Sequence, residues 1–200
     1  MRRMRTREGP RHRDCLIRMW SRLRDTEGAQ ILELAITLPL MVVLMVGIFD
    51  FGQAFNTKQK ITAAAREAAR FAANQGTTDL SNSPPPSILA VRDLVSGYLQ
   101  TNNMTDCGLA TSSAVSQAPA PMNWKFTANG CVASMTLTIN RGNTFTYIQG
   151  GNTYTVEATR VDLSYPFQWH FNSVIKLVVP SANYAGITQL TANTAIPNMN

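Results

Sequence analysis

The residue types that build catalytic or metal centres are scarce in this chain. It has two histidines and three cysteines, and neither His12 nor His170 stands at a ligand spacing from a cysteine. No glycine-rich phosphate loop follows a predicted strand, and the carboxylates are too scattered along the chain for a metal-binding loop. We therefore expect no enzyme activity, no metal, no cofactor and no small-molecule substrate.

Positive charge is concentrated at one end of the chain. Residues 1–28 carry nine arginines and four acidic residues, a net charge of +5, whereas the other 172 residues carry nine basic and eight acidic side chains, a net charge of +1. The basic stretch lacks the interleaved aromatic residues and the folded scaffold of nucleic-acid binders, so nucleic acid is not an expected partner. Arginines directly before an apolar run instead follow the positive-inside rule, which predicts a cytoplasmic leader.

A long apolar run follows the basic leader. Leu34–Phe49 contains no charged residue, and the helix Ile31–Phe51 would be about 31 Å long, close to the hydrocarbon thickness of a bilayer. A secretory signal peptide would have a shorter apolar core and a cleavage site nearby, whereas the candidate Ala63–Ala65 lies far beyond this run. The sequence therefore predicts one transmembrane helix, which Pro39 should kink or locally unwind, with the remainder of the chain exported.

Helix-forming residues continue beyond the predicted span to about Asn74. Ile61, Ala65, Ala68 and Ala72 recur there at helical spacing and form a stripe of mostly small residues. Small side chains let two elements approach closely. The stripe therefore suits helix packing, either against the chain's own domain or against like helices in a filament.

The rest of the chain predicts a small domain of helices and strands. After a break at Gly76–Pro86, Ser87 is expected to cap a short helix that ends near Leu99. From Trp124 onward, apolar and polar residues alternate as in half-buried strands. The expected elements are strands at 133–139, 144–148 and 153–165, turns at 141–143 and 150–152, an end of the third strand at Pro166, a helix or apolar excursion at 167–179, and a last strand at 184–192.

Hairpin connections between these strands predict an antiparallel sheet with the helices on one face, which is an α+β fold. The expected organisation is a basic cytoplasmic leader at 1–28, a transmembrane and extended helix at 29–75, and an exported α+β domain at 76–200.

Cys107 and Cys131 lie in the part of the chain predicted to be exported, whereas Cys15 lies in the leader. In an oxidising compartment the two exported cysteines are compatible with a disulfide, worth about 3 kcal/mol in the chain-entropy model. Two free buried thiols are the alternative. The disulfide is favoured because Thr101–Asn123 is long for a structureless loop unless a crosslink holds it.

A single acid, Glu33, stands near the start of the apolar run. A carboxylate at this position needs a partner, which a neighbouring subunit or a freed amino terminus can supply. Alternatively, Glu33 is an interfacial residue that reaches water and interacts favourably with the helix dipole. The assembly interpretation is favoured because Glu33 follows two apolar residues rather than preceding them.

Four motifs, in this order, resemble the TadE-like minor pseudopilins of tight-adherence (Flp-type) pili. They are Gly28-Ala29-Gln30-Ile31-Leu32-Glu33, Leu38-Pro39-Leu40, Asp50-Phe51-Gly52, and Ala64-Ala65-Arg66-Glu67-Ala68-Ala69-Arg70. The later stretch Val161–Phe167 is similar to the late strand of these proteins. Leu34 departs from the related major pilins, in which an aromatic residue commonly follows the acid, and those pilins are far shorter.

The resemblance implies cleavage after Gly28 by a membrane prepilin peptidase, which makes Ala29 the new amino terminus and Glu33 the fifth residue of the mature chain. Its implied partners are the membrane, the peptidase, other pilins or pseudopilins and the pilus assembly machinery. The implied location is the bacterial inner membrane, with a cytoplasmic amino terminus and a periplasmic domain that can enter an extracellular pilus. The alternative is an unprocessed, membrane-tethered periplasmic binding or scaffolding protein.

Overall fold

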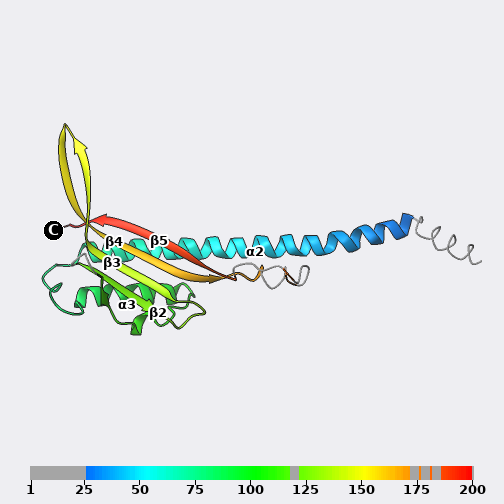
Figure 1. The fold of residues 1–200 in the computed structure, drawn as a ribbon, viewed down its shortest axis with the longest axis horizontal. Helices are drawn as coiled ribbons and strands as arrows, with labels where there is room; N and C mark the ends of the chain where they lie inside the picture. Colours follow the sequence, from blue (N-terminus) through cyan, green and yellow to red (C-terminus); the bar gives the residue numbers. More distant parts are fainter. Residues whose placement is uncertain (1–25, 118–121, 172–175, 177–180, 182–185, 200) are drawn as a thin grey trace, which may run out of the picture.

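The computed structural model describes residues 26–117, 122–171, 176, 181 and 186–199. One long helix, α2 (Thr26–Ala73), extends away from a small domain that also encloses its C-terminal part (Figure 1). The other elements are α3 (Pro86–Thr101), η1 (Leu109–Thr111), β1 (Val115–Ser116), β2 (Asn123–Ala128), β3 (Met135–Gln149), β4 (Asn152–Gln168) and β5 (Ile187–Pro197). The α+β fold expected from the sequence is confirmed, whereas residues 1–25 of the leader lie outside the described residues.

Helix α2 runs without interruption for 48 residues, through Pro39, and ends one residue before the predicted position. The expected local unwinding is absent. Proline removes only the hydrogen bond to the Ala35 carbonyl, and the turns on both sides remain helical. In the turn before it, the Thr37 hydroxyl donates to the Glu33 carbonyl oxygen at 2.9 Å.

The five strands form one antiparallel sheet in the order β1-β2-β3-β4-β5. Alternate residues of the central strands point to one face, where they are buried: Phe126 in β2, Leu137 and Ile139 in β3, and Val161 and Leu163 in β4. The buried faces of α2 and α3 join these residues in a single core. The domain therefore has two layers, with both helices on one face of the sheet, and the opposite face is polar.

The turn predicted at Arg141–Asn143 is wrong. Strand β3 continues through these residues, and the register shifts between Asn140 and Asn143 at a β-bulge. Arg141 keeps the inward alternation of Leu137 and Ile139, and its N–H donates to the Met122 carbonyl at 2.8 Å, so the Arg-Gly-Asn sequence forms a bulge instead of a hairpin. The predicted second turn is present, because Gly150 and Gly151, both at positive φ, join β3 to β4.

Three further expectations need correction. Ser87 does not cap α3, because that helix begins at Pro86 with Pro85 at its cap position. The predicted third strand is β4, and Pro166 does not end it, because β4 continues to Gln168. Strand β3 pairs with β4 only as far as Ser164, so the edge of β4 that faces β3 is free at Pro166, where a missing N–H is tolerated. The last strand, predicted at 184–192, is β5 at 187–197. Of the predicted helix or apolar excursion at 167–179, the structure describes only residues 167–171 and 176.

Beyond the bulge, β3 and β4 leave the sheet and form a two-stranded hairpin that projects from the end of the domain farthest from the start of α2 (Figure 1). Its residues are exposed, including Phe145, Tyr147, Ile148 and Tyr154. The rings of Tyr147 and Tyr154, which pair across the hairpin, stack with centroids 5.3 Å apart.

Candidate processing and assembly site

Gly28 and Ala29 lie in the first turns of α2, and both are exposed. No described part of the domain covers them. An extended backbone at this position would require the turn to unwind. Glycine makes the unwinding easier, because within a helix it is less stable than alanine by roughly 1 kcal/mol.

Glu33 is exposed and lies one helical turn beyond Ala29, on the same face of α2. Its side chain forms no hydrogen bond or salt bridge with any described residue. The described part of one chain thus offers this carboxylate no partner.

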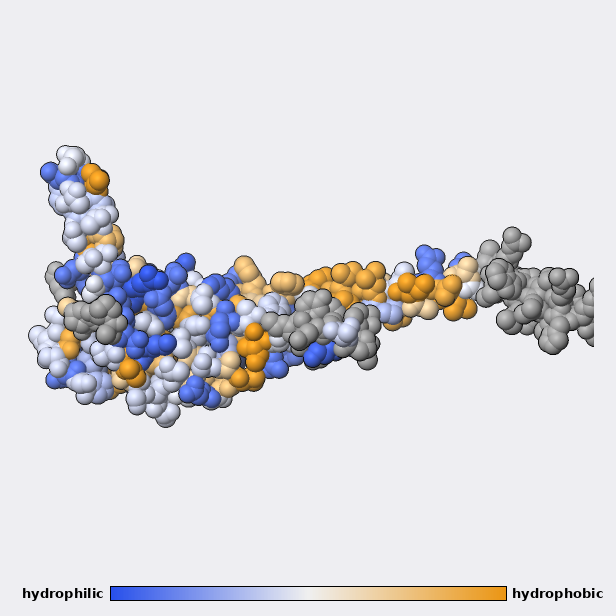
Figure 2. Space-filling model, in the orientation of Figure 1, coloured by the Kyte–Doolittle hydropathy of each residue, from blue (hydrophilic) through white to orange (hydrophobic). Residues whose placement is uncertain are grey.

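The surface of α2 beyond Glu33 is largely apolar. The residues from Ile31 to Phe55 include many large hydrophobic side chains that are exposed, such as Ile36, Leu44 and Ile48. An 18-residue window has a mean hydropathy of 2.5, and none of it is buried in the structure. Figure 2 shows this hydrophobic surface along the part of the helix that leaves the domain. The helix is thus long and apolar enough to anchor the chain in a membrane.

The predicted helix-packing stripe lies in the core of the chain's own domain. Ile61, Ala65, Ala68 and Ala72 are at most 1% exposed and belong to the core cluster with the sheet and α3. Sequence reasoning missed Ala64, Ala69 and Ala73, which are equally buried. The side chains beside the stripe, Arg66, Glu67 and Arg70, are exposed. Among the described residues, the packing that the structure shows is therefore intramolecular.

Asp50 anchors a contact between α2 and the end of β4 that the sequence did not reveal. It is 2% exposed, and its carboxylate accepts the backbone N–H of Phe171. His170 Nδ1 lies 3.4 Å from the other carboxylate oxygen. The sequence marked Asp50 only as part of a motif and His170 only as a residue at a domain edge, because nothing in the spacing of residues 50 and 170 links them.

A buried arginine closes the opposite end of α2. Arg141 is 2% exposed and donates to the carbonyl oxygens of Gln75 at 2.6 Å and Gly76 at 2.8 Å, just beyond the end of the helix. Burial lowers the pKa of its guanidinium, and the negative charge of Asp79 partly opposes this. The Asp79 carboxylate accepts the Ser87 N–H at 2.7 Å and its hydroxyl at 3.0 Å. Burial opposes ionisation of Asp79, but these hydrogen bonds and Arg141 hold its pKa below the usual value.

Cys107 and Cys131 form a disulfide with a Cα–Cα distance of 5.0 Å. The Gly130 N–H donates to the Cys107 carbonyl at 2.8 Å, and a Cβ on Gly130 would lie 2.6 Å from that oxygen, so the close approach requires glycine. The disulfide and this hydrogen bond attach the loop after α3 to the loop between β2 and β3.

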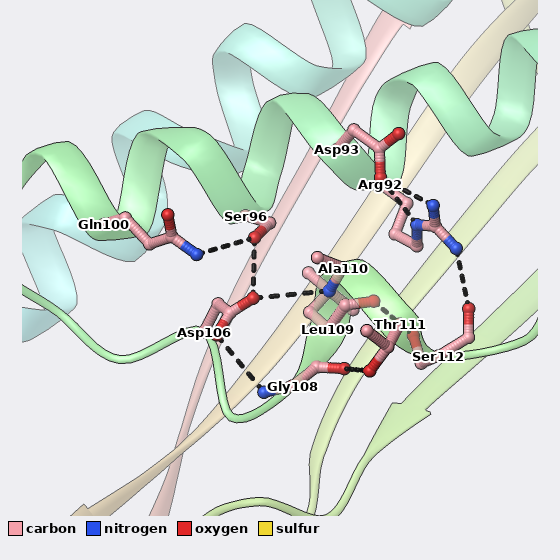
Figure 3. Close-up of polar contacts among 10 residues, drawn as sticks. All are labelled: Arg92, Asp93, Ser96, Gln100, Asp106, Gly108, Leu109, Ala110, Thr111 and Ser112. Carbon is pink, nitrogen blue, oxygen red and sulfur yellow. Dashed lines mark hydrogen bonds and ion pairs between the residues drawn. The ribbon is translucent and has the colours of Figure 1, made fainter.

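Asp106 fixes the Cys107 loop on α3 (Figure 3). Its carboxylate accepts hydrogen bonds from the Ser96 hydroxyl at 2.7 Å and from the N–H groups of Gly108 at 3.2 Å and Ala110 at 3.3 Å. The hydrogen bond from Ser96 is the largest cause of the lowered pKa of Asp106. Burial raises this pKa, and the hydrogen bonds from the backbone N–H groups lower it further.

Within the described ranges, no group of three or more His, Cys, Asp or Glu residues is placed to hold a metal ion. A cavity of about 290 Å³ opens beside the disulfide, between Val132, Tyr165 and Ile187. Its lining contains no acid or histidine, and no chemistry follows from it.

These features define an α+β protein with one helix long and apolar enough to cross a membrane, and the processing and assembly candidates all lie on that helix. Residues 28–70 match the TadE family model, described as TadE-like protein. Over this segment the chain is similar to TadE-like proteins, which supports the resemblance to the tight-adherence pilus system that the motifs predicted. The match contains Gly28, Glu33, Asp50 and most of the stripe, and ends before α3 and the sheet. No curated protein and no solved structure matches the chain.

Proposed function

We propose that this chain is a minor pseudopilin, an accessory subunit in the assembly of a tight-adherence, type IV-like pilus. The observation that carries the proposal is the coincidence of the family match, which starts at Gly28, with the start of an exposed, apolar helix. The basic residues before Gly28 would hold that end of the chain in the cytoplasm, and α2 would span the inner membrane.

In this proposal a prepilin peptidase cleaves after Gly28 and releases the amino group of Ala29. The exposure of both residues supports access, and the missing side chain of Gly28 suits a narrow cleft. Cleavage removes a segment with a net charge of +5. The mature chain would then begin with a free amine at the edge of its apolar helix.

Glu33 would pair with the freed amine of a neighbouring subunit. A charge at the centre of a span costs about 3 kcal/mol on insertion scales, and less near the edge. The pairing would offset this cost, which an isolated subunit cannot do through any described side chain. Because the stripe is buried in its own domain, contacts with neighbouring helices would come from the exposed part of α2, before Ala54.

Two substitutions separate processing from assembly. Gly28→Phe should block entry into the peptidase, so the full-length precursor accumulates in the membrane. Glu33→Ala should be cleaved, because its side chain lies beyond the scissile bond, yet the mature subunit should fail to support piliation. Gln30→Ala, a change at a neighbouring exposed residue, is the matched control and should be processed and assembled.

The measurements are immunoblots and amino-terminal sequencing of the membrane-extracted protein, with pili counted by electron microscopy. Normal pili with a cleaved Glu33→Ala subunit would show that the acid is only an interfacial helix residue. A wild-type protein that retains Met1 to Gly28 would instead support a tethered binding or scaffolding protein, for which the projecting hairpin is the candidate contact surface.

A further inference from the structure

The first residues after β4 contact α2 on the side of the domain that faces the predicted membrane. The contacts come from three consecutive residues, Trp169, His170 and Phe171, which follow the end of β4 at Gln168. They meet α2 at Phe51, Asp50 and Gly47, well before the part of the helix that enters the domain core at Ile61.

The depth of these contacts follows from the helix. The ring of Phe171 lies 3.7 Å from where a Cβ on Gly47 would be, so it is level with Gly47. Gly47 lies four residues before Phe51, the predicted end of the span, and at about 1.5 Å per residue that is roughly 6 Å below it. If α2 spans the membrane as proposed, Phe171 lies below the outer edge of the apolar layer and Trp169 lies at that edge.

The chemistry of the segment suits this depth. The Trp169 ring packs edge-on against Phe51 and Phe167, with centroids 5.4 and 5.0 Å away. Its indole N–H is directed toward the domain, where it donates to the Thr188 hydroxyl at 2.7 Å. Tryptophan with a satisfied polar edge and an apolar body is typical of membrane interfaces.

Asp50 resolves the main objection to this placement, namely a carboxylate at the edge of the apolar layer. Its side chain is 4% exposed, accepts the Phe171 N–H and faces His170. Its one hydrogen bond and its contact with the imidazole therefore both come from this segment. A carboxylate held in this way need not face lipid unpaired.

We infer that the Trp169–Phe171 segment is a second membrane contact, which inserts into the outer interface of the same bilayer that α2 spans. The occupant of this surface is lipid, because the segment is continuous with the apolar face of α2, from Gly47 to the exposed Phe51 and Phe55. The sheet domain therefore rests directly on the membrane and is not carried above it on a free helix. The inference rests on α2 being the membrane anchor.

Quenching of tryptophan fluorescence by brominated lipids tests this in the full chain reconstituted into vesicles. Trp20→Phe keeps Trp124 and Trp169, and Trp20→Phe with Trp169→Phe keeps only Trp124, so the difference between them is the signal of Trp169. Trp124 is 5% exposed in the domain core and serves as the unquenched reference. A third variant adds Leu40→Trp to the second and reports on the middle of the predicted membrane span, Ile31–Phe51.

We expect Trp169 to lose most of its emission when bromines lie near the glycerol end of the acyl chains, and less when they lie near the bilayer centre. The Leu40→Trp signal should show the opposite order, and Trp124 should change little. Quenching at Leu40→Trp without quenching at Trp169 overturns the inference and leaves the anchor intact, as when a protein partner covers the segment. Loss of quenching at both positions overturns the anchor itself.

Discussion

A single buried arginine joins strand β3 to the C-terminal end of helix α2. Arg141 occupies an inward position of β3, yet its guanidinium donates to the last carbonyls after α2. Those carbonyl oxygens have no helical partner, so the arginine supplies what a C-terminal cap would. Its position depends on the bulge, which keeps β3 continuous where the sequence suggests a turn.

Arg141→Met should therefore be one of the most damaging changes in the domain. It keeps much of the buried aliphatic volume but leaves two carbonyls without donors, and we expect a loss of about 2–4 kcal/mol in the free energy of unfolding. The measurement is the urea midpoint of the detergent-solubilised protein. Arg160→Met is the control: Arg160 pairs with Asp162 on the surface, so its loss should cost less than about 1 kcal/mol. Equal midpoints for the two variants would contradict the capping role.

The lowered pKa of Asp106 predicts how the stability of the domain changes in acid. Its folded-state pKa is lowered, so the ionised carboxylate contributes stability that is fully present above about pH 4, the ordinary pKa of aspartate. This stability is lost as the pH falls through the lowered folded value. The melting temperature should therefore fall on acidification below about pH 4.

Ser96→Ala isolates the cause, because the Ser96 hydroxyl is the largest contribution to the lowered pKa of Asp106. The variant should melt at a lower temperature than the wild type at neutral pH, and the gap should narrow in acid. Asp79 shifts in the same direction in both proteins, so it does not affect the difference. A gap that is constant with pH would show that Ser96 acts through packing alone.

At the scale of elements, the sequence predicted what depends on local patterns. The span, the end of α2, the apolar face of α3 and the glycine turn at Gly150–Gly151 follow from composition and periodicity, which act within a few residues. The bulge at Arg141 and the continuation of β4 through Pro166 do not, because each depends on which neighbour lies across the sheet. The Asp50 contact, which joins residues about 120 positions apart, could not be read from spacing at all.

The stripe on α2 provides a prediction at this scale. Ala68 is fully buried against the core, so Ala68→Leu forces added methyl groups into packed space and should destabilise the domain by about 1–3 kcal/mol. Arg66→Leu, two positions away and exposed, makes the same helix more apolar without touching the core. It should leave the melting temperature nearly unchanged.

The pair separates the two roles that the sequence left open for the stripe. Melting followed by circular dichroism reports on the domain, and counted pili report on assembly. An Ala68→Leu subunit that melts normally but prevents assembly would mean that the stripe packs between subunits and that the intramolecular packing is not essential.

The whole molecule is organised by α2, which is an exposed apolar helix at one end, the proposed membrane anchor, and a core helix at the other. Its exposed part requires lipid or neighbouring helices, and its last turns cannot leave the domain without opening the core. Movement of the anchor therefore displaces the sheet directly. The contact at Asp50 and Trp169 makes the connection stiffer, because it attaches the domain to the helix at a second level.

The orientation of this assembly gives the last prediction. With the net charge of +5 at residues 1–28 on the cytoplasmic side, a reporter fused after Asn200 that works only in the periplasm should be active. A reporter that works only in the cytoplasm should be silent at the same position. Cys107 and Cys131 give an independent check, because an exported domain meets oxidising conditions and both cysteines should resist thiol labelling in the denatured, unreduced protein. Cytoplasmic activity together with two labelled cysteines would reverse the orientation of α2 and remove the basis for both membrane proposals.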